Sequence, residues 1–131
     1  MKLIYHRQQW PDQDSTYIMT EDGSGMVRVT CEKTTSELKE ALISDLFVYE
    51  DRRHEGIGTE LLLAAVKEFA DKVDYAYLTI KSDYRSVEKN PKLKNLVDFY
   101  ESRGFKVSGI YSEVFCMVKD VDKYKSNVND K

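Results

Sequence analysis

The amino-acid sequence predicts an α/β protein in which helices flank a mixed β-sheet of six to seven strands, an α+β arrangement. Apolar and polar residues alternate through much of residues 3–48, as they do in half-buried strands. From Gly56 the apolar period changes to 3.6, which indicates a helix, and a segment rich in aromatic and β-branched residues follows at 75–80. A strand, a helix and a second strand in this order predict a right-handed crossover between parallel strands.

The first half of the chain predicts four strands, over residues 3–6, 16–19, 26–32 and 41–48. The turn at residues 22–25, Asp-Gly-Ser-Gly, tolerates positive φ and should join the second and third strands as a hairpin. The fourth segment is densest in apolar residues, which predicts a central strand with both faces covered.

The second half predicts two helices and three strands. The first helix should run about five turns, with its apolar stripe formed by Ile57, Leu61, Leu62, Ala65, Val66, Phe69 and Val73. A strand over 75–80 follows. A second helix over 92–103 should place Leu93, Leu96, Val97 and Tyr100 on one stripe and end at Gly104. Strands over 105–110 and 113–119, joined near Tyr111 and Ser112, should close the sheet.

Length and composition restrict the class of protein. With 131 residues and 41% hydrophobic content, the chain can form one core, so we expect a single domain over 1–119 and a polar, flexible tail over 120–131. A net charge of -3 argues against nucleic-acid binding. Apolar runs are too short to span a membrane and no signal-peptide core follows Met1, which predicts a cytoplasmic protein. Cys31 and Cys116 lack metal-binding or redox spacing, so we expect reduced thiols and no metal site.

Residues 45–59 carry the clearest chemical signal, because an apolar strand runs into a helix through a basic turn with two glycines. Glycines let a ligand approach the backbone, and the first helical turn offers unpaired N–H groups and a partial positive charge. A pyrophosphate would fit such a turn. The three-glycine dinucleotide pattern and the Walker pattern are both missing. Taken alone, the turn also fits an ordinary helix start.

The turn matches the pattern Gln/Arg-x-x-Gly-x-Gly/Ala at Arg53, Gly56 and Gly58, and here the chain resembles the GNAT N-acetyltransferase family. The order and spacing of elements over 16–118 agree with that family, shortened at the N-terminus. The resemblance implies acetyl-coenzyme A as acyl donor, a small-molecule or peptide amine as acceptor, and direct transfer in a ternary complex. It assigns coenzyme A binding to Phe47, Val48, Arg53, His54, Glu55, Gly56, Ile57, Gly58, Thr59 and Asn95.

The resemblance also implies catalytic groups. Tyr100, four residues before Gly104, stands where many family members place the acid that protonates the departing thiolate. A base is harder to assign, because Leu42 and Ser44 occupy positions where some members carry a carboxylate. The remaining candidates are Asp45, Glu40, Glu113 and Asp83, and we favour Asp45.

Two departures from the family pattern leave alternatives open. Leu93 stands where members often have asparagine, with Asn95 nearby but out of phase. The two helices that usually wall the acceptor site are replaced by a short loop over 8–15. The acceptor site is then either open or completed by a second subunit in a homodimer. The alternatives to an enzyme are a non-catalytic, regulatory acyl-coenzyme A binding module and an interaction protein that keeps only the fold.

Overall fold

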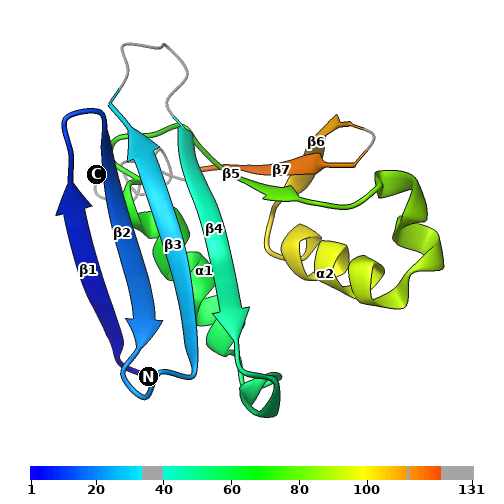
Figure 1. Cartoon of the computed structure of the whole chain (residues 1–131), viewed down its shortest axis with the longest axis horizontal. Coiled ribbons are helices and arrows are strands. Elements are labelled where there is room, and N and C mark those ends of the chain that lie inside the picture. Colours follow the sequence, from blue (N-terminus) through cyan, green and yellow to red (C-terminus); the bar gives the residue numbers. More distant parts are fainter. Residues whose placement is uncertain (34–39, 112, 122–131) are drawn as a thin grey trace, which may run out of the picture. The chain divides into compact units, whose positions relative to one another are not determined.

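The computed structural model describes residues 1–33, 40–111 and 113–121, and it contains one seven-stranded sheet in the order β1-β2-β3-β4-β5-β7-β6 (Figure 1). The strands are β1 Leu3–Gln9, β2 Gln13–Thr20, β3 Gly25–Glu32, β4 Glu40–Val48, β5 Tyr75–Ile80, β6 Lys106–Ile110 and β7 Phe115–Asp120. The helices are α1 Ile57–Glu68 and α2 Pro91–Glu101, with short 3-10 helices η1 Glu50–Arg52 and η2 Tyr84–Lys89. The predicted fold class and all seven strands are confirmed. Ser112 and residues 122–131 of the tail predicted over 120–131 lie outside the described residues, whereas Asp120 is the last residue of β7.

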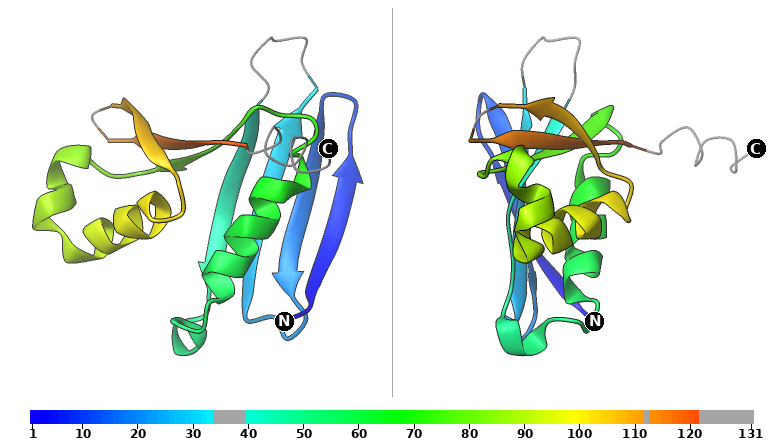
Figure 2. Two further views of the ribbon diagram at one scale, coloured as in Figure 1. Left: turned by 180° about the vertical axis from the view of Figure 1, so that it is seen from behind. Right: turned by 90° about the vertical axis from the view of Figure 1, so that its right-hand side faces the viewer.

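The described chain forms two compact units, and the first comprises described residues up to Ala76 together with Val121. In this unit β1, β2, β3 and β4 are joined in sequence by antiparallel pairing. Helix α1 packs against one face of these strands (Figure 2). Its buried residues Ile57, Leu61, Leu62 and Ala65 meet a sheet face that includes Ile18, Val27, Val29, Ala41 and Ile43. Burial of this apolar surface holds the unit together.

The opposite face of β1–β4, here called the outer face, carries no described helix of this unit (Figure 1). Register places Met26, Arg28 and Thr30 of β3 on it, beside Phe47, Ser44 and Leu42 of β4. These side chains are half-buried, and Phe47 is 45% exposed. The prediction that both faces of β4 are covered was therefore wrong. Its apolar density reflects one buried face and one half-exposed face.

Helix α1 is shorter than predicted and ends after 12 residues rather than five turns. Phe69 leaves the helical conformation, with φ -117° and ψ 24°. Phe69 and Val73 are nevertheless buried, and the N–H of Val73 donates to the carbonyl of Phe69 in a separate turn. The apolar spacing thus continued past the end of the helix. Near that end, Arg7 of β1 makes two 3.0 Å bonds to the Glu68 carboxylate.

The second unit comprises residues 77–120 and contains most of β5, both η2 and α2, and the antiparallel pair β6 and β7. Helix α2 starts as its sequence requires: the Asn90 side chain accepts from two first-turn N–H groups, and Pro91 occupies the first position. It ends at Glu101, two residues before the predicted end, and the turn after it contains Gly104, whose φ is +94°. Leu96 is 40% exposed, so the predicted stripe was wrong at this residue. In the described part of the chain, neither helix is long and apolar enough to cross a membrane.

Candidate functional site

Strand β4 contains a bulge close to its C-terminal end. Opposite Val27 of β3 it places two residues, Asp45 and Leu46, where a regular strand has one. Asp45 has φ 55°, the left-handed conformation that aspartate adopts more readily than most residues. This is the geometry of a bulge whose first residue is left-handed. Because of the extra residue, Ile43 and Val48 face the same side of the sheet although they are five positions apart.

The chain then turns from β4 into α1 through η1 and four exposed residues, Arg53 to Gly56. His54 and Gly56 both have positive φ, 69° and 83°. Gly56 is the N-cap of α1, and no side chain caps the first-turn N–H groups. Left-handed residues ahead of uncapped N–H groups form a concave array of donors that suits an anion. The turn therefore has the left-handed residues and uncapped N–H groups expected of its sequence, and the pyrophosphate site stays a prediction.

The surroundings of Gly56 leave room for such a group. A Cβ added at Gly56 would meet no atom within 4 Å. Arg53 supplies positive charge at the same turn, and its Nε donates a 3.0 Å hydrogen bond to the carbonyl of Val48. Ile57 is buried under the turn, while Gly58 and Thr59 are half-buried in the first turn of α1. The turn thus combines open space, a guanidinium and backbone donors, which together fit a phosphate-bearing ligand.

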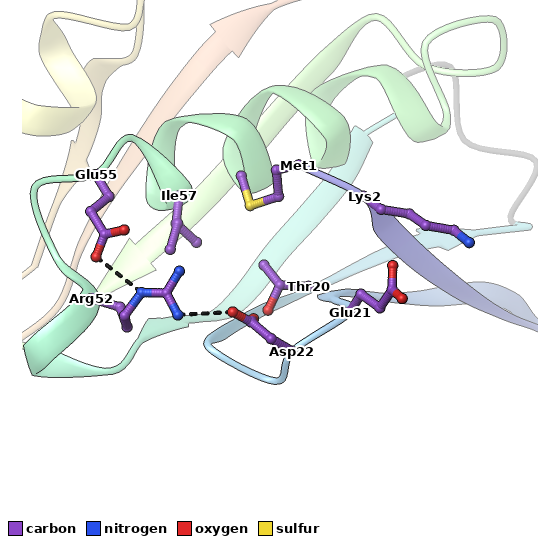
Figure 3. Close-up of a pocket in the computed structure, with 8 residues that line it drawn as sticks. All are labelled: Met1, Lys2, Thr20, Glu21, Asp22, Arg52, Glu55 and Ile57. Atoms are coloured by element: carbon purple, nitrogen blue, oxygen red, sulfur yellow. Dashed lines mark hydrogen bonds and ion pairs between the residues drawn. The ribbon is translucent and has the colours of Figure 1, made fainter.

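A second arginine holds this turn to the β2–β3 hairpin. Arg52 donates from Nη1 to Asp22 at 2.8 Å and from Nε to Glu55 at 3.0 Å (Figure 3). Hydrogen bonds from Ser24, and then from Thr20 and Arg52, lower the pKa of the Asp22 carboxyl below its usual range. Arg52, Asp22, Glu55 and Thr20 border a cavity of about 590 Å³ in the first unit. Sequence reasoning missed Asp22, because a turn aspartate thirty positions away gives no signal of its partner.

Gly25 is a further residue whose role the sequence did not reveal. The Asp-Gly-Ser-Gly turn predicted positive φ, but in this turn only Gly23 adopts it, at 77°. Gly25 instead allows close packing, since a Cβ there would lie 2.9 Å from Leu61, 3.0 Å from the Phe47 carbonyl and 3.1 Å from Ile57. The start of α1 therefore rests directly on β3 at a position where only glycine fits.

A match to a family model identifies the protein family of the chain. Residues 12–107 match the family model described as an acetyltransferase (GNAT) domain. The chain belongs to the GNAT acetyltransferases. No protein of curated function matches the sequence. The resemblance predicted from Arg53, Gly56 and Gly58 is thereby confirmed at the level of the family.

Solved structures show the same fold for this GNAT domain. An acetyltransferase from Thermus thermophilus is 20% identical with a TM-score of 0.59, covering 84% of this chain and 65% of that one. An aminoglycoside 6'-N-acetyltransferase complexed with coenzyme A is 18% identical with a TM-score of 0.63, covering 85% and 74%. A GNAT acetyltransferase from Elizabethkingia anophelis with acetyl-CoA bound is 10% identical with a TM-score of 0.62, covering 90% and 97%. The chain spans just under two thirds of the Thermus protein.

Tyr100 of this GNAT domain lies in the second unit, on the buried side of α2. It is 8% exposed, and its ring makes edge contacts with Phe99 and Phe105 at 5.4 and 5.8 Å. Burial raises the pKa of its phenol. Among the described residues its hydroxyl has no hydrogen-bond partner. On the same helix Leu93 is buried, whereas Asn95 is exposed on the opposite side.

The four carboxylates named as candidate bases of this GNAT domain differ in their surroundings. Asp45 is exposed in the bulge of β4, and Glu40 is exposed at the start of that strand. Asp83 is bound by Arg85 through several hydrogen bonds, which lower the pKa of its carboxyl and make it a weaker base. Glu113 is exposed in the second unit. In the described ranges no group of three or more His, Cys, Asp or Glu could hold a metal ion.

Proposed function

We propose that this GNAT domain transfers the acetyl group of acetyl-coenzyme A to a primary amine by direct attack in a ternary complex. The observation that carries the proposal is the turn before α1, where left-handed His54 and Gly56 precede uncapped N–H groups beside Arg53. Residues 53–59 would hold the pyrophosphate with Arg53 as the charged partner. The acceptor is a small amine or a peptide amine.

The bulge of β4 would serve the other end of the same ligand. Phe47 and Val48 follow the bulge and would pair through their backbone with the pantetheine arm, and Asn95 of α2 is proposed to assist on that side. A backbone N–H of this strand would polarise the acetyl carbonyl, which is stabilisation by a fixed dipole. The bulge supports this assignment because extra residues locally disrupt ladder pairing.

Two side chains are proposed to move protons. A primary amine with a pKa of about 10.4 is largely protonated at neutral pH, so Asp45 would accept its proton, directly or through water. As the new C–N bond forms and the C–S bond breaks, Tyr100 would give its proton to the departing sulfur. Its raised pKa keeps the phenol protonated until that step. Its hydroxyl, without a partner in the described part of the chain, is available for this bond.

We infer that residues 1–119 act as one acetyltransferase domain, because the family match at 12–107 runs through both units. A cytoplasmic location agrees with the two free cysteines, Cys31 and Cys116, which suit a reducing compartment.

A second candidate function is a regulatory module that binds acyl-coenzyme A without catalysis. The outer face favours it, since no described helix of the first unit walls an acceptor there. Association into a homodimer would supply that wall.

The first experiment is calorimetric titration of the protein with acetyl-coenzyme A, followed by a thiol-release assay with polyamines, aminoglycosides, amino acids and peptides. Binding together with release on one acceptor class supports the enzyme. Binding without release on any acceptor supports the regulatory module. Failure to bind acetyl-coenzyme A would refute both the enzyme and the regulatory module. The matched variant is Gly56→Val, which should lose binding because valine does not readily adopt the positive φ of Gly56.

A further inference from the structure

The outer face of the first unit has one charged side chain at its centre. Around Arg28, register assembles three rows of residues from β2, β3 and β4: Met19, Met26 and Phe47; Tyr17, Arg28 and Ser44; Ser15, Thr30 and Leu42. Among these described residues only Arg28 is charged at neutral pH. Glu32, the acidic residue of β3 on this face, lies four positions away, about 13 Å along the strand.

Neutral groups hold the Arg28 guanidinium. The Nε of Arg28 donates a 3.1 Å hydrogen bond to the Ser15 hydroxyl, and the guanidinium carbon Cζ lies 5.4 Å from the centre of the Tyr17 ring. Ser15 is 0% exposed, and its Oγ lies 3.3 Å from the Thr30 hydroxyl. A buried hydroxyl with two neighbours fixes the direction of the bond that it accepts. Arg28 is therefore a positioned cation rather than a loose surface side chain.

Arg28 lacks the carboxylate that other arginines of the chain have. Arg7 pairs with Glu68, Arg52 with Asp22 and Glu55, and Arg85 with Asp83. In the part of the chain that the structure describes, Arg28 makes no ion pair. A half-buried charge without a counter-charge costs free energy, which an anionic ligand would recover. The two terminal nitrogens of a guanidinium match the two oxygens of a carboxylate.

The position of Arg28 relates this cation to the proposed chemistry. It lies opposite Ser44, the residue immediately before Asp45 and the bulge. Arg28 and Asp45 are not within ion-pair distance of each other, so a cation and an anion flank the same stretch of β4 separately. An amine that also carries a carboxylate presents the complementary pair of charges.

We propose that the acceptor is a small amine bearing a carboxylate, such as an amino acid, and that Arg28 binds this carboxylate. The inference rests on the proposed function and narrows its acceptor class. Arg28 orients the acceptor so that its amine faces the bulge, where Asp45 accepts the proton. A polyamine lacks the group that Arg28 would bind, and its second ammonium would be repelled.

The test compares acceptors that differ only in the carboxylate, lysine with cadaverine and tyrosine with tyramine, using kcat/KM from thiol release. We expect wild type to prefer the carboxylate member of each pair, and Arg28→Gln to reduce that preference by about 10- to 100-fold. Arg28→Lys should keep part of this preference, because lysine retains the positive charge but lacks the two parallel N–H donors of a guanidinium. The ratio between variants removes the difference in amine pKa within a pair. Lys67→Gln removes an exposed charge from α1 and should leave the preference unchanged.

Binding of acetyl-coenzyme A and the thermal midpoint, measured for each variant, would report whether Arg28→Gln is folded. Equal turnover of both members of each pair, or the same ratio in Arg28→Gln, would overturn the inference while leaving the acetyltransferase intact. Acetylation of peptide amines alone, or a dimer that buries Arg28 and excludes small acceptors, would also overturn it. Absence of both binding and release would reject the proposed function and this inference with it.

Discussion

The Nη1 of Arg52 lies 2.8 Å from Oδ2 of Asp22, so the turn before α1 is tied to the β2–β3 hairpin. Both side chains are about half exposed, and an exposed ion pair contributes little to stability because water screens it. We expect Arg52→Gln and Asp22→Asn each to weaken acetyl-coenzyme A binding about two- to fivefold, measured by calorimetry. The cause is a less ordered turn rather than a lost phosphate contact.

A charge swap separates these two causes. Asp22→Arg combined with Arg52→Asp should recover part of the affinity, whereas a phosphate ligand at Arg52 would make the double variant worse than either single one. The exposed pair Lys94 and Asp98 in α2 is the matched control, and Lys94→Gln should not change binding.

Gly25→Ala should disturb the start of α1. The new Cβ would meet the Phe47 carbonyl at 3.0 Å and Leu61 at 2.9 Å, and backbone cannot move aside as a side chain can. We expect a loss of about 1–3 kcal/mol in the free energy of unfolding and weaker acetyl-coenzyme A binding. Gly23→Asn is the control, since its site has open space and asparagine tolerates the positive φ. Equal stability of both variants would contradict the close packing.

Tyr100→Phe should lower kcat by about 10²–10⁴ and leave acetyl-coenzyme A affinity nearly unchanged. The ring and its contacts with Phe99 and Phe105 remain, so the variant loses only the hydroxyl group and the proton that it would donate. Tyr111→Phe, at a 66% exposed phenol, should behave as wild type in the same steady-state assay. Full activity of Tyr100→Phe would remove this residue from the mechanism.

The phenol of Tyr100 should titrate above the ordinary tyrosine pKa of about 10, because burial raises its pKa. A raised pKa means that the neutral phenol contributes stability below the unfolded-state pKa, and that this contribution is lost as pH rises through the folded-state pKa. The phenolate absorbance of wild type minus Tyr100→Phe should therefore appear only above about pH 10. A difference curve centred at or below that pH would show that the phenol is hydrated.

Arg7→Met should destabilise the fold without changing acceptor preference. The Glu68 side chain is only 7% exposed, and removing Arg7 leaves its carboxylate without two 3.0 Å donors. An unsatisfied buried acceptor costs about 1–3 kcal/mol, which denaturant unfolding would measure. The double variant Arg7→Met with Glu68→Leu should recover much of the loss. If the single variant were as stable as wild type, the ion pair of Arg7 and Glu68 would not contribute to the stability of the fold.

The predicted elements matched best where a single local signal decided them. Strand β5 was predicted with the residues that it has, and the hairpin of β2 and β3 followed from its turn chemistry. The 3-10 helix η2 was missed, because Asp83 caps it in a polar stretch without apolar period. The end of α1 was missed because Phe69 and Val73 keep helical spacing beyond it. Backbone conformation, and not apolar spacing, ended the helix.

The sequence indicated the backbone conformation of the candidate site but not the residues that hold it in place from distant segments. Arg53, Gly56 and Gly58 marked the turn, and the structure gives it the left-handed residues and open N–H groups that an anion needs. Asp22 and Gly25 act through partners far away in sequence, and Arg28 depends on the hydroxyl of Ser15 on the neighbouring strand. Cross-strand relations of this kind appear only when register is known.

Because Asp45 and Leu46 both stand opposite Val27, the alternation of side chains between the two faces of β4 shifts by one residue at the bulge and gives the strand two phases. Up to Ile43 the odd-numbered positions face α1, and after the bulge the even-numbered ones do. Deleting Asp45 would restore a single phase with Phe47 still on the outer face and Val48 still facing α1, because the bulge already absorbs the extra residue. One codon therefore separates a strand whose pairing with β3 is interrupted just before Phe47 from a strand that pairs with β3 without interruption.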